Sequence, residues 1–393
     1  MADKTETAMQ EALVIDDEQW EELIELTNGA AAQCFQCGVC TATCPWGQVK
    51  EETVSIRTLM RQAQVGLPDG KDQLWLCTTC AQCEAYCPRG VEITEVFRGL
   101  RQAAWNQGEA EKGLPTLLWS VYWNNNPWSQ APSQRSHWAK DMDLPVFDPE
   151  QHETLYYIGC TSAYNQRAHS VAQSLAQVYK KAGVAFGVLG DEEPCCGESV
   201  LNVGHKDYFE EIVDKNAAFF EEKGVGQMVT ISPHCYDAFK NHYPNNSGKF
   251  EPVHYTQQLA GLIDEGRLKF KDELDLKVTF QDPCYLARHN DETDAPRQVL
   301  EAIPGVELVE MEYVGKDTLC CGGGGGRMWL ETAAGERFSD LRVEEATQTG
   351  ASVLATACPA CISCLEDSLK AKKIDSIAVM DIAEIVGLAM GVH

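Results

Sequence analysis

The chain has 393 residues, of which 44% are apolar, and it carries 59 acidic against 32 basic side chains, for a net charge of −27. This length favours two or three domains, and the acidic balance argues against a nucleic-acid backbone as partner. The 18 cysteines belong to a long chain that begins with a polar segment and shows no apolar signal sequence. They therefore indicate metal binding rather than a secreted disulfide scaffold.

No run reaches the roughly 18 apolar residues that a membrane span requires. The closest, residues 377–392, is interrupted by Asp381 and Glu384, so we expect an amphipathic terminal helix there. Together these features predict a cytoplasmic protein that would reach a membrane only through a partner subunit.

Residues 1 to about 30 have the pattern of a capped acidic helix. Asp16 or Asp17 can cap it. Its apolar stripe consists of Trp20, Leu23, Ile24 and Leu26. We assign this helix a role in packing or docking.

The sharpest signal is a duplicated run of four cysteines with a proline after the fourth. The runs are Cys34-x2-Cys37-x2-Cys40-x3-Cys44-Pro45 and Cys77-x2-Cys80-x2-Cys83-x3-Cys87-Pro88. This spacing is that of bacterial two-cluster ferredoxins, in which the fourth cysteine of each run binds the other cluster. We therefore expect two [4Fe-4S] cubanes, one on Cys34, Cys37, Cys40 and Cys87 and the other on Cys77, Cys80, Cys83 and Cys44. Paired zinc knuckles are the weaker alternative.

Helices are expected on both sides of the second run, and a linker after them. Residues 54–65 have helical periodicity, and a helix over about 94–105 would place its apolar residues on one face. Over residues 108–151 the composition changes to Trp, Asn, Pro and Ser, which predicts a linker. We expect its tryptophans to pack rather than to relay electrons; they are Trp119, Trp123, Trp128 and Trp138.

The rest of the chain alternates short strands with longer helices, and its strands lead into cysteines. In the first half, strands are expected at residues 155–159, 184–189 and 228–232, before Cys160, Cys195-Cys196 and Cys235. In the second half they are expected at residues 276–280, 306–311 and 352–356, before Cys284, Cys320-Cys321 and Cys358. The pattern predicts two α/β units with parallel sheets, whose sites lie beyond the carboxyl ends of the strands. The cysteines are separated by similar numbers of residues in the two units, so we expect the second unit to repeat the first.

Five thiols of the second unit are gathered at three points, and they are Cys284, Cys320, Cys321, Cys358 and Cys361. Two are adjacent in the chain, which suits a polynuclear centre better than a single zinc, whose usual signature is two spaced pairs. Five glycines follow at residues 322–326, where backbone can pass close to a cluster and adopt positive φ. This run lacks the Lys-Ser/Thr ending of a phosphate loop, so we expect no nucleotide.

The order of one cysteine, a span, Cys-Cys-Gly, a second span and Cys-x2-Cys resembles the CCG domain of heterodisulfide reductases and related iron–sulfur oxidoreductases. The resemblance extends through Asp282-Pro283-Cys284-Tyr285-Leu286-Ala287-Arg288-His289 and through Cys34-Phe35-Gln36-Cys37-Gly38. It implies an α/β fold with tandem CCG domains, each a Rossmann-like parallel sheet, behind an α-helical ferredoxin-like domain with two [4Fe-4S] clusters. It also implies that Cys284, Cys320, Cys321, Cys358 and Cys361 bind a non-cubane [4Fe-4S] cluster at which disulfide chemistry takes place.

The expected domains are residues 1–107 for the helix and ferredoxin-like region, 108–151 for the linker, 152–272 for the first CCG domain and 273–393 for the second. The first CCG domain departs from the family pattern at Ala238, which stands where the second has Cys361. Four thiols remain there, Cys160, Cys195, Cys196 and Cys235. They could hold a zinc, a different cluster or nothing, with His234 as a conceivable substitute ligand. The full non-cubane site is assigned only to the second repeat.

Three residues near the second site have more than one interpretation. Cys364 is either a sixth site thiol or, as buried cysteines usually are, a small apolar side chain. His289 and Arg288 follow Cys284 closely and could donate a proton or a hydrogen bond to a sulfur leaving group, since disulfide reduction consumes protons. Their alternative roles are helix capping or pairing with a carboxylate.

These features predict an iron–sulfur oxidoreductase subunit that passes electrons through two cubanes to a non-cubane centre, where a disulfide is reduced or a thiol oxidised. The alternative is a pure electron-transfer subunit of a larger anaerobic complex, such as a flavin-dependent dehydrogenase or an electron-bifurcating assembly. The resemblance implies partners among other redox subunits, such as a flavoprotein, a hydrogenase-type subunit or a membrane cytochrome. A zinc-rich scaffold, the third interpretation, would contain little iron.

Overall fold

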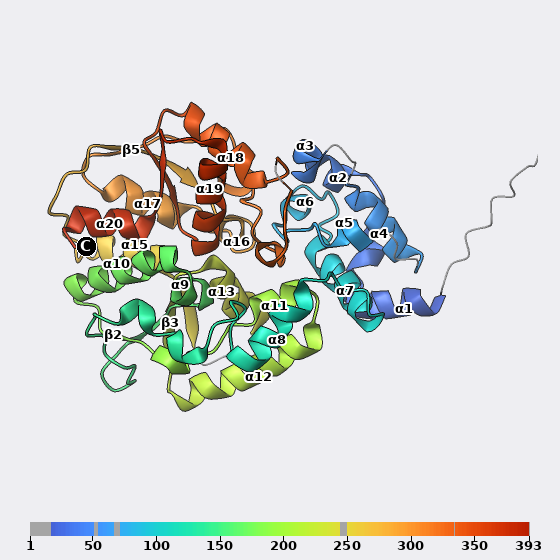
Figure 1. The fold of residues 1–393 in the computed structure, drawn as a ribbon, viewed down its shortest axis with the longest axis horizontal. Helices are drawn as coiled ribbons and strands as arrows, with labels where there is room; N and C mark the ends of the chain where they lie inside the picture. The colour runs from blue at the N-terminus through green and yellow to red at the C-terminus, as the bar shows by residue number, and fades with distance from the viewer. Residues whose placement is uncertain (1–16, 51–53, 67–70, 244–249, 334, 393) are drawn as a thin grey trace, which may run out of the picture.

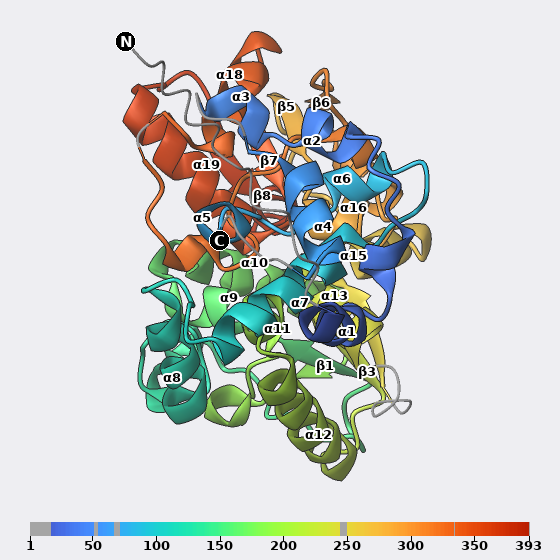
Figure 2. The same ribbon diagram turned by 90° about the vertical axis from the view of Figure 1, so that its right-hand side faces the viewer.

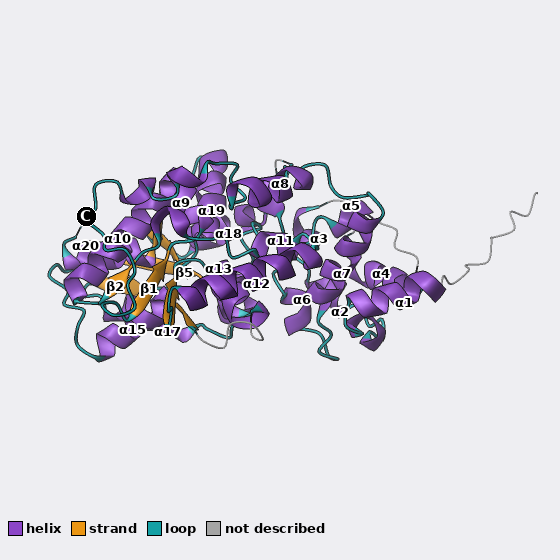
Figure 3. Ribbon diagram, turned by 90° about the horizontal axis from the view of Figure 1, so that it is seen from below, coloured by secondary structure: helices purple, strands orange, loops and turns teal. Residues whose placement is uncertain are grey.

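The structure is a computed structural model that describes residues 17–50, 54–66, 71–243, 250–333 and 335–392. A helical N-terminal module, in blue in Figure 1, packs beside two α/β repeats, in green and in orange to red. Figure 2 turns this module toward the viewer, in front of both repeats. Helices surround the strands of the sheets (Figure 3).

The N-terminal module consists of short helices that carry the cysteine runs between them. These are α1 (Asp17–Leu26), η1 (Ala30–Gln33), α2 (Val39–Thr43), α3 (Trp46–Val49), α4 (Ile56–Gln64), α5 (Lys71–Leu74), α6 (Gln82–Ala85) and α7 (Ile93–Asn106). The helices expected over 54–65 and 94–105 are confirmed by α4 and α7. Ser55 caps α4 by accepting a hydrogen bond from the Thr58 N–H. Asp17 is the first residue of α1, and Asp16 lies outside the described residues.

Residues 108–151 run along the first repeat and contain α8 (Leu114–Asn124), η2 (Pro132–Gln134) and η3 (His137–Ala139). Two tryptophans pack as expected: Trp138 lies on Tyr156 with ring centroids 6.2 Å apart, and Trp128 lies on Trp329 at 5.0 Å. The side chains of Trp119 and Trp123 are 61% and 69% exposed. The expected packing role is therefore wrong for these two residues of α8.

The first repeat is a parallel four-stranded sheet in the order β2-β1-β3-β4. Its strands are β1 (Thr154–Tyr157), β2 (Phe186–Gly187), β3 (Gln227–Thr230) and β4 (Glu251–His254). Its helices and turns are α9 (Cys160–Tyr164), α10 (Gln166–Ala182), η4 (Gly190–Glu192), α11 (Glu198–Asn202), α12 (Lys206–Glu222), α13 (Pro233–Asp237), η5 (Ala238–His242) and α15 (Tyr255–Asp264). All of β1 is buried, as is usual for a central parallel strand with helices on both faces.

The second repeat has the same topology, with the strand order β6-β5-β7-β8. Its strands are β5 (Leu276–Gln281), β6 (Val306–Leu308), β7 (Val353–Thr356) and β8 (Ala378–Asp381). Its helices and turns are α16 (Cys284–Ala287), α17 (Asp294–Ala302), η6 (Gly315–Asp317), η7 (Arg327–Trp329), α18 (Phe338–Gln348), α19 (Pro359–Lys372) and α20 (Ile382–Met390). The predicted α/β fold with two parallel sheets is thereby confirmed.

The structure corrects the prediction for the C-terminal stretch. Residues 378–381 form the edge strand β8, so the terminal helix α20 begins only at Ile382. The Asp381 carboxylate accepts a hydrogen bond from the Ala383 N–H, and the Glu384 carboxylate accepts one from the Asp381 N–H. The two acidic residues therefore form a capping box that marks the start of a helix. The edge strand β4 of the first sheet contains Pro252 and had no predicted counterpart, because proline weakens a strand pattern.

The two repeats pack against each other mainly through α10 and α20, and their apolar side chains form one continuous core. Arg167 of α10 forms ion pairs with Glu366 at 2.5 Å and with Glu384 at 2.7 Å. None of the described helices combines the length and apolarity needed to cross a membrane.

Candidate functional site

Four cysteines of the N-terminal module line one cavity. Cys34, Cys37, Cys40 and Cys87 share this lining with Phe35, Arg57 and Arg89. Cys87 comes from the second run, so the structure brings together the crossed set that the ferredoxin spacing predicts. Cys37 is exposed, Cys40 is buried and the other two are half-buried.

The other four cysteines of the module, Cys44, Cys77, Cys80 and Cys83, are close enough for their charges to interact. Burial raises the pKa of Cys44 to about 12 and that of Cys77 to about 11. A thiolate is unfavourable in such surroundings unless a nearby cation compensates for it. Iron would supply that charge.

The two cysteine runs share backbone conformation as well as spacing. Gln36 and Thr79, the third residue of each run, have positive φ values of 66° and 51°. This left-handed conformation costs a non-glycine residue about 1–2 kcal/mol. Its presence at the same position of both runs indicates that both need the same turn. The Gln36 N–H donates to Cys34 Sγ and the Thr79 N–H donates to Cys77 Sγ, both at 3.4 Å. Each turn therefore directs a peptide N–H at a sulfur, and such hydrogen bonds tune iron–sulfur clusters.

The five thiols of the second repeat converge at the carboxyl ends of β5 and β7. Cys284 opens α16, while Cys358 and Cys361 lie at the start of α19. The Cys284 and Cys320 Sγ atoms are 4.0 Å apart, and those of Cys321 and Cys361 are 3.3 Å apart. β5 and β7 are neighbours where the strand order reverses direction, which is where sites of α/β folds form.

Two of these five thiols favour the thiolate form. A hydrogen bond with Cys284 lowers the pKa of Cys320, and the Gly322 N–H lies 3.2 Å from Cys320 Sγ. Burial alone would raise the pKa of Cys358, but hydrogen bonds with Cys361 and His234 bring it well below its ordinary value. Thiolates are the form that binds metal.

The second repeat meets the N-terminal module at its thiols. Cys80 packs against the buried cluster that contains Cys284 and Cys320, and Thr78 Oγ1 lies 3.8 Å from Cys320 Sγ. The glycine run passes the same place, and a Cβ on Gly324 would overlap the carbonyl oxygen of Thr78. The absence of side chains there lets two backbones touch, and φ is positive at Gly322 as expected.

Arg101 of α7 holds this junction together. Its buried guanidinium donates to the carbonyl oxygens of Leu74 at 3.0 Å, Cys77 at 2.7 Å, Asn202 at 2.5 Å and Gly325 at 3.1 Å. One side chain therefore joins the N-terminal module to both repeats. Nothing in the spacing of Arg101 within α7 distinguishes it from a surface arginine.

One cavity is also lined by the four thiols of the first repeat, Cys160, Cys195, Cys196 and Cys235, together with residues 323–326 of the glycine run. The Cys196 and Cys235 Sγ atoms are 3.4 Å apart. The buried Arg135, from residues 108–151, lies 3.6 Å from Cys160 Sγ and forms an ion pair of 2.8 Å with Glu193. Sequence reasoning missed both residues. Glu193 directly precedes Pro194-Cys195 in the chain, so its place near the first set could have been predicted. Arg135 lies far from these cysteines in the sequence, and no local pattern marks it.

His234 lines the cavity of the first-repeat thiols and also interacts with Cys358 of the second site. Its Nδ1 is 2.7 Å from Glu198 Oε1, and its ring lies 4.0 Å from that of Tyr285. Burial alone would lower the pKa of His234, but Glu198 and Cys358 raise it well above its ordinary value. Its expected role as a substitute ligand of the first set stays a prediction.

His289 and Arg288 contact backbone in this structure. His289 Nε2 lies 2.8 Å from the Thr79 carbonyl oxygen, its ring stacks on Tyr285, and burial lowers its pKa to about 4. Arg288 donates to the carbonyl oxygens of Cys80 and Thr318, both at 2.6 Å. The structure therefore does not place the predicted catalytic His289 against a sulfur of the second site.

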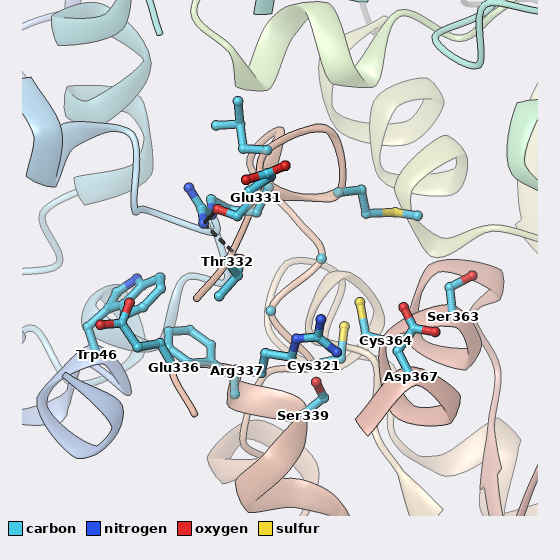
Figure 4. Close-up of a pocket in the computed structure, with 16 residues that line it drawn as sticks. Trp46, Cys321, Glu331, Thr332, Glu336, Arg337, Ser339, Ser363, Cys364 and Asp367 are labelled. Atoms are coloured by element: carbon cyan, nitrogen blue, oxygen red, sulfur yellow. Dashed lines mark hydrogen bonds between the residues drawn. The ribbon is translucent and has the colours of Figure 1, made fainter. Parts of the chain in front are cut away.

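A cavity of about 450 Å³ opens onto the second site. Cys321 and Cys364 line it, and Arg337 points toward both thiols in Figure 4. The apolar part of the lining includes Trp46 and Phe338, whose ring centroids are 4.7 Å apart. The remaining charged residues of the lining are Arg327, Glu331, Glu336 and Asp367.

Within the described ranges, no group of three or more His, Cys, Asp or Glu residues forms a site that could hold a metal ion. The thiols of the two repeats instead lie in pairs, Cys284 with Cys320, Cys321 with Cys361, and Cys196 with Cys235. Backbone N–H groups donate to some of these sulfurs, as Gly322 does to Cys320. A set made of thiols alone matches the chemistry of iron–sulfur clusters, which are held by cysteine thiolates.

Comparisons with known proteins agree with this architecture. Residues 154–240 and 278–366 match the model of a cysteine-rich domain named CCG, and residues 30–91 match that of a 4Fe-4S dicluster domain. A subunit of the dihydromethanophenazine:CoB–CoM heterodisulfide reductase of Methanosarcina barkeri is 31% identical over 91% of this chain and 93% of its own length. The chain belongs to the family of this heterodisulfide reductase subunit. Its matched regions are accordingly those of iron–sulfur oxidoreductases.

Two other relatives of this heterodisulfide reductase-like chain are longer than it is. FadF of Bacillus subtilis, a probable iron–sulfur-binding oxidoreductase, is 35% identical over 80% of the chain and 46% of its own length. EtfAB:quinone oxidoreductase of Syntrophomonas wolfei is 31% identical over 96% of the chain and 60% of its own length. The chain thus spans about half of the first relative and three-fifths of the second.

Proposed function

We propose that this subunit passes electrons singly through two [4Fe-4S] cubanes to a non-cubane [4Fe-4S] centre that reduces a disulfide or oxidises two thiols. The proposed ligands of that centre are Cys284, Cys320, Cys321, Cys358 and Cys361. The observation that carries the proposal is the packing of Cys80 against the buried cluster that contains Cys284 and Cys320, with Thr78 Oγ1 3.8 Å from Cys320 Sγ. It supports a continuous path, because a ligand of one proposed cubane lies beside ligands of the proposed substrate centre. In the balanced reaction, R–S–S–R′ takes up two electrons and two protons and gives two thiols.

When bound, such a cluster would supply one-electron steps and an iron site for a substrate sulfur. The residues of the chain would form the substrate cavity beside it. The 450 Å³ cavity reaches Cys321, which is otherwise buried. Arg337, aimed at Cys321 in Figure 4, would attract an anionic substituent of the substrate, and Trp46 and Phe338 offer an apolar wall.

Replacement of Cys321 by serine tests this function. We expect reduction of a small aromatic disulfide by reduced methyl viologen to fall on the order of 100-fold or more, since loss of even an outer-shell contact can cost that much. The cubane signals in the electron paramagnetic resonance spectrum should persist, because Cys321 belongs to neither cubane set. The matched variant Cys196→Ser, at the corresponding position of the first repeat, should keep the signal of the second-repeat centre. Undiminished turnover in Cys321→Ser would refute the catalytic assignment.

A second function, electron transfer without a substrate of its own, is favoured by the likeness to EtfAB:quinone oxidoreductase over 96% of the chain. On this alternative the chain connects a flavoprotein to another redox subunit of a larger complex. The two functions differ in how the oxidised protein responds to added thiols. A new paramagnetic signal with a thiol supports the disulfide function, and its absence with every thiol tested supports pure electron transfer.

For the first repeat we propose a separate metal or cluster on Cys160, Cys195, Cys196 and Cys235. Arg135 beside Cys160 would offset part of the negative charge of such a set. The proposal also places the chain in the cytoplasm as one subunit of a redox complex, attached to a membrane only through a partner.

A further inference from the structure

One end of the cysteine path reaches the surface of the N-terminal module. Among the eighteen cysteines, all of which lie within the described residues, Cys37 alone is exposed. It lines a cavity together with the other three members of its set. The second cubane set is at the opposite end of the path, since its member Cys80 packs against the buried cluster that contains Cys320. An electron partner can therefore approach most closely at Cys37.

An exposed aromatic side chain stands next to this cysteine. Phe35 is 58% exposed and belongs to the same cavity lining as Cys37. Exposed aromatic residues are frequent anchors of protein interfaces. Trp119, Tyr122 and Trp123 of α8 are also exposed, but they do not line this cavity. Because electron transfer slows steeply with distance, Phe35 is the better placed anchor for an electron partner.

The rim of this surface is basic in a strongly acidic chain. Arg57 and Arg89 line the cavity, and both are exposed, as is Arg61 one turn further along α4. Arg57 packs over Gly38, with its Cδ 3.4 Å from where a Cβ would stand. Glu92, which follows Val91 of the lining, is the neighbouring exposed acid. With a net charge of −27, arginines gathered around one cysteine set favour a partner of opposite sign there.

We infer that this surface docks a small electron-transfer protein whose cofactor is surrounded by acidic residues. Phe35 is the apolar anchor, and Arg57 and Arg89 form the charged rim. Each encounter moves one electron, so that the partner is oxidised by one electron and the cubane set on Cys34, Cys37, Cys40 and Cys87 is reduced by one. The inference rests on the proposed function for the two cubanes, but reduction of the cubanes needs no disulfide.

The test uses the full chain with its clusters and a reduced plant-type [2Fe-2S] ferredoxin as an acidic probe. Stopped-flow bleaching of the cluster absorbance gives the second-order rate constant, which should fall as ionic strength rises. Arg57→Glu and Arg89→Glu should each lower it on the order of 10-fold at low salt and have little effect at 1 M salt, where charges are screened within about 3 Å. Phe35→Ser should lower it at both salt concentrations, because an apolar contact is not screened.

The matched control is Lys269→Glu, which changes the charge of the chain equally at an exposed residue between α15 and β5. This variant should react at the wild-type rate. Iron content and the spectrum after dithionite reduction check that each variant keeps its cubanes. Equal rates in all variants, or an effect of Lys269→Glu as large as that of Arg57→Glu, would overturn the inference. Loss of disulfide turnover with normal ferredoxin reduction would count against the proposed disulfide function alone.

Discussion

Asp381 is a buried carboxyl group at the start of α20, where it accepts hydrogen bonds from the Tyr255 hydroxyl at 2.5 Å and from the Ala383 N–H at 2.9 Å. Burial nevertheless raises its pKa to about 8. The group is therefore protonated in the folded chain at pH values where an unfolded aspartate is charged. Its contribution to stability is complete below about pH 4 and is lost as the pH rises toward 8.

We predict that Asp381→Asn weakens this pH dependence. The wild-type free energy of opening α20, measured by hydrogen exchange and corrected for intrinsic rates, should fall by on the order of 2 kcal/mol between pH 6 and pH 8. In the variant the fall should be much smaller, because asparagine keeps an acceptor for Tyr255 and Ala383 but does not titrate. An equal fall in both proteins would show that another group is responsible.

The residues that could be predicted are those with fixed spacing. The cysteine runs and the Cys-Cys-Gly signatures are local in sequence, so their grouping follows from known ligand spacing. Arg135 and His234 act on cysteines far along the chain, 25 residues away for Cys160, and no local pattern marks them. His289, adjacent in sequence to a site, was expected to contact sulfur, but stacking on Tyr285 directs its ring to the Thr79 carbonyl instead.

At the scale of elements, the glycine run at residues 322–326 is one of the contacts between the second repeat and the N-terminal module. Sequence reasoning expected it to approach a cluster, and it also lies against the backbone of the second cysteine run. Gly324 does not need its glycine for backbone conformation, since its φ is not positive. Its role is steric, because a Cβ would overlap the Thr78 carbonyl oxygen.

We predict that Gly324→Ala separates these two elements. The two backbones would have to move apart at a cost of about 1–3 kcal/mol, and the packing of Thr78 and Cys80 against Cys320 would weaken. Hydrogen exchange should become faster at the amides of residues 78–80. The control Gly261→Ala lies in α15 with nothing within 4 Å of the added Cβ and should leave that exchange unchanged. Equal exchange in both variants would mean that the junction does not depend on this close approach.

At the scale of the whole molecule, three modules meet around the thiols of the second repeat. The order of modules, the parallel sheets and most helices follow from periodicity and spacing in the sequence. The edge strands β4 and β8 and the docking of the modules do not, because they depend on contacts such as those of Arg101 between segments far apart in the chain.

We predict that Arg101→Lys loosens this docking more than it destabilises any one module. Lysine cannot direct several N–H groups at the carbonyl oxygens of Cys77, Asn202 and Gly325. Limited proteolysis under anaerobic conditions should cut the variant faster between α7 and the first repeat than the wild type. The matched variant Arg267→Lys, at an arginine that is 38% exposed, should be cut at the wild-type rate. Identical digestion of all three proteins would contradict a joining role for Arg101.

The central claim is that five cysteines of the second repeat hold a multi-iron centre beside two cubanes. Iron and zinc analysis of the chain purified anaerobically with its native partners, repeated for Cys321→Ser, tests it most directly. Three four-iron clusters predict about 12 iron atoms per chain, to which iron held by the first repeat would add, and the count should fall by about 4 in the variant. About 8 iron atoms in the wild type with no change in the variant, or zinc bound to the second-repeat thiols, would contradict the claim.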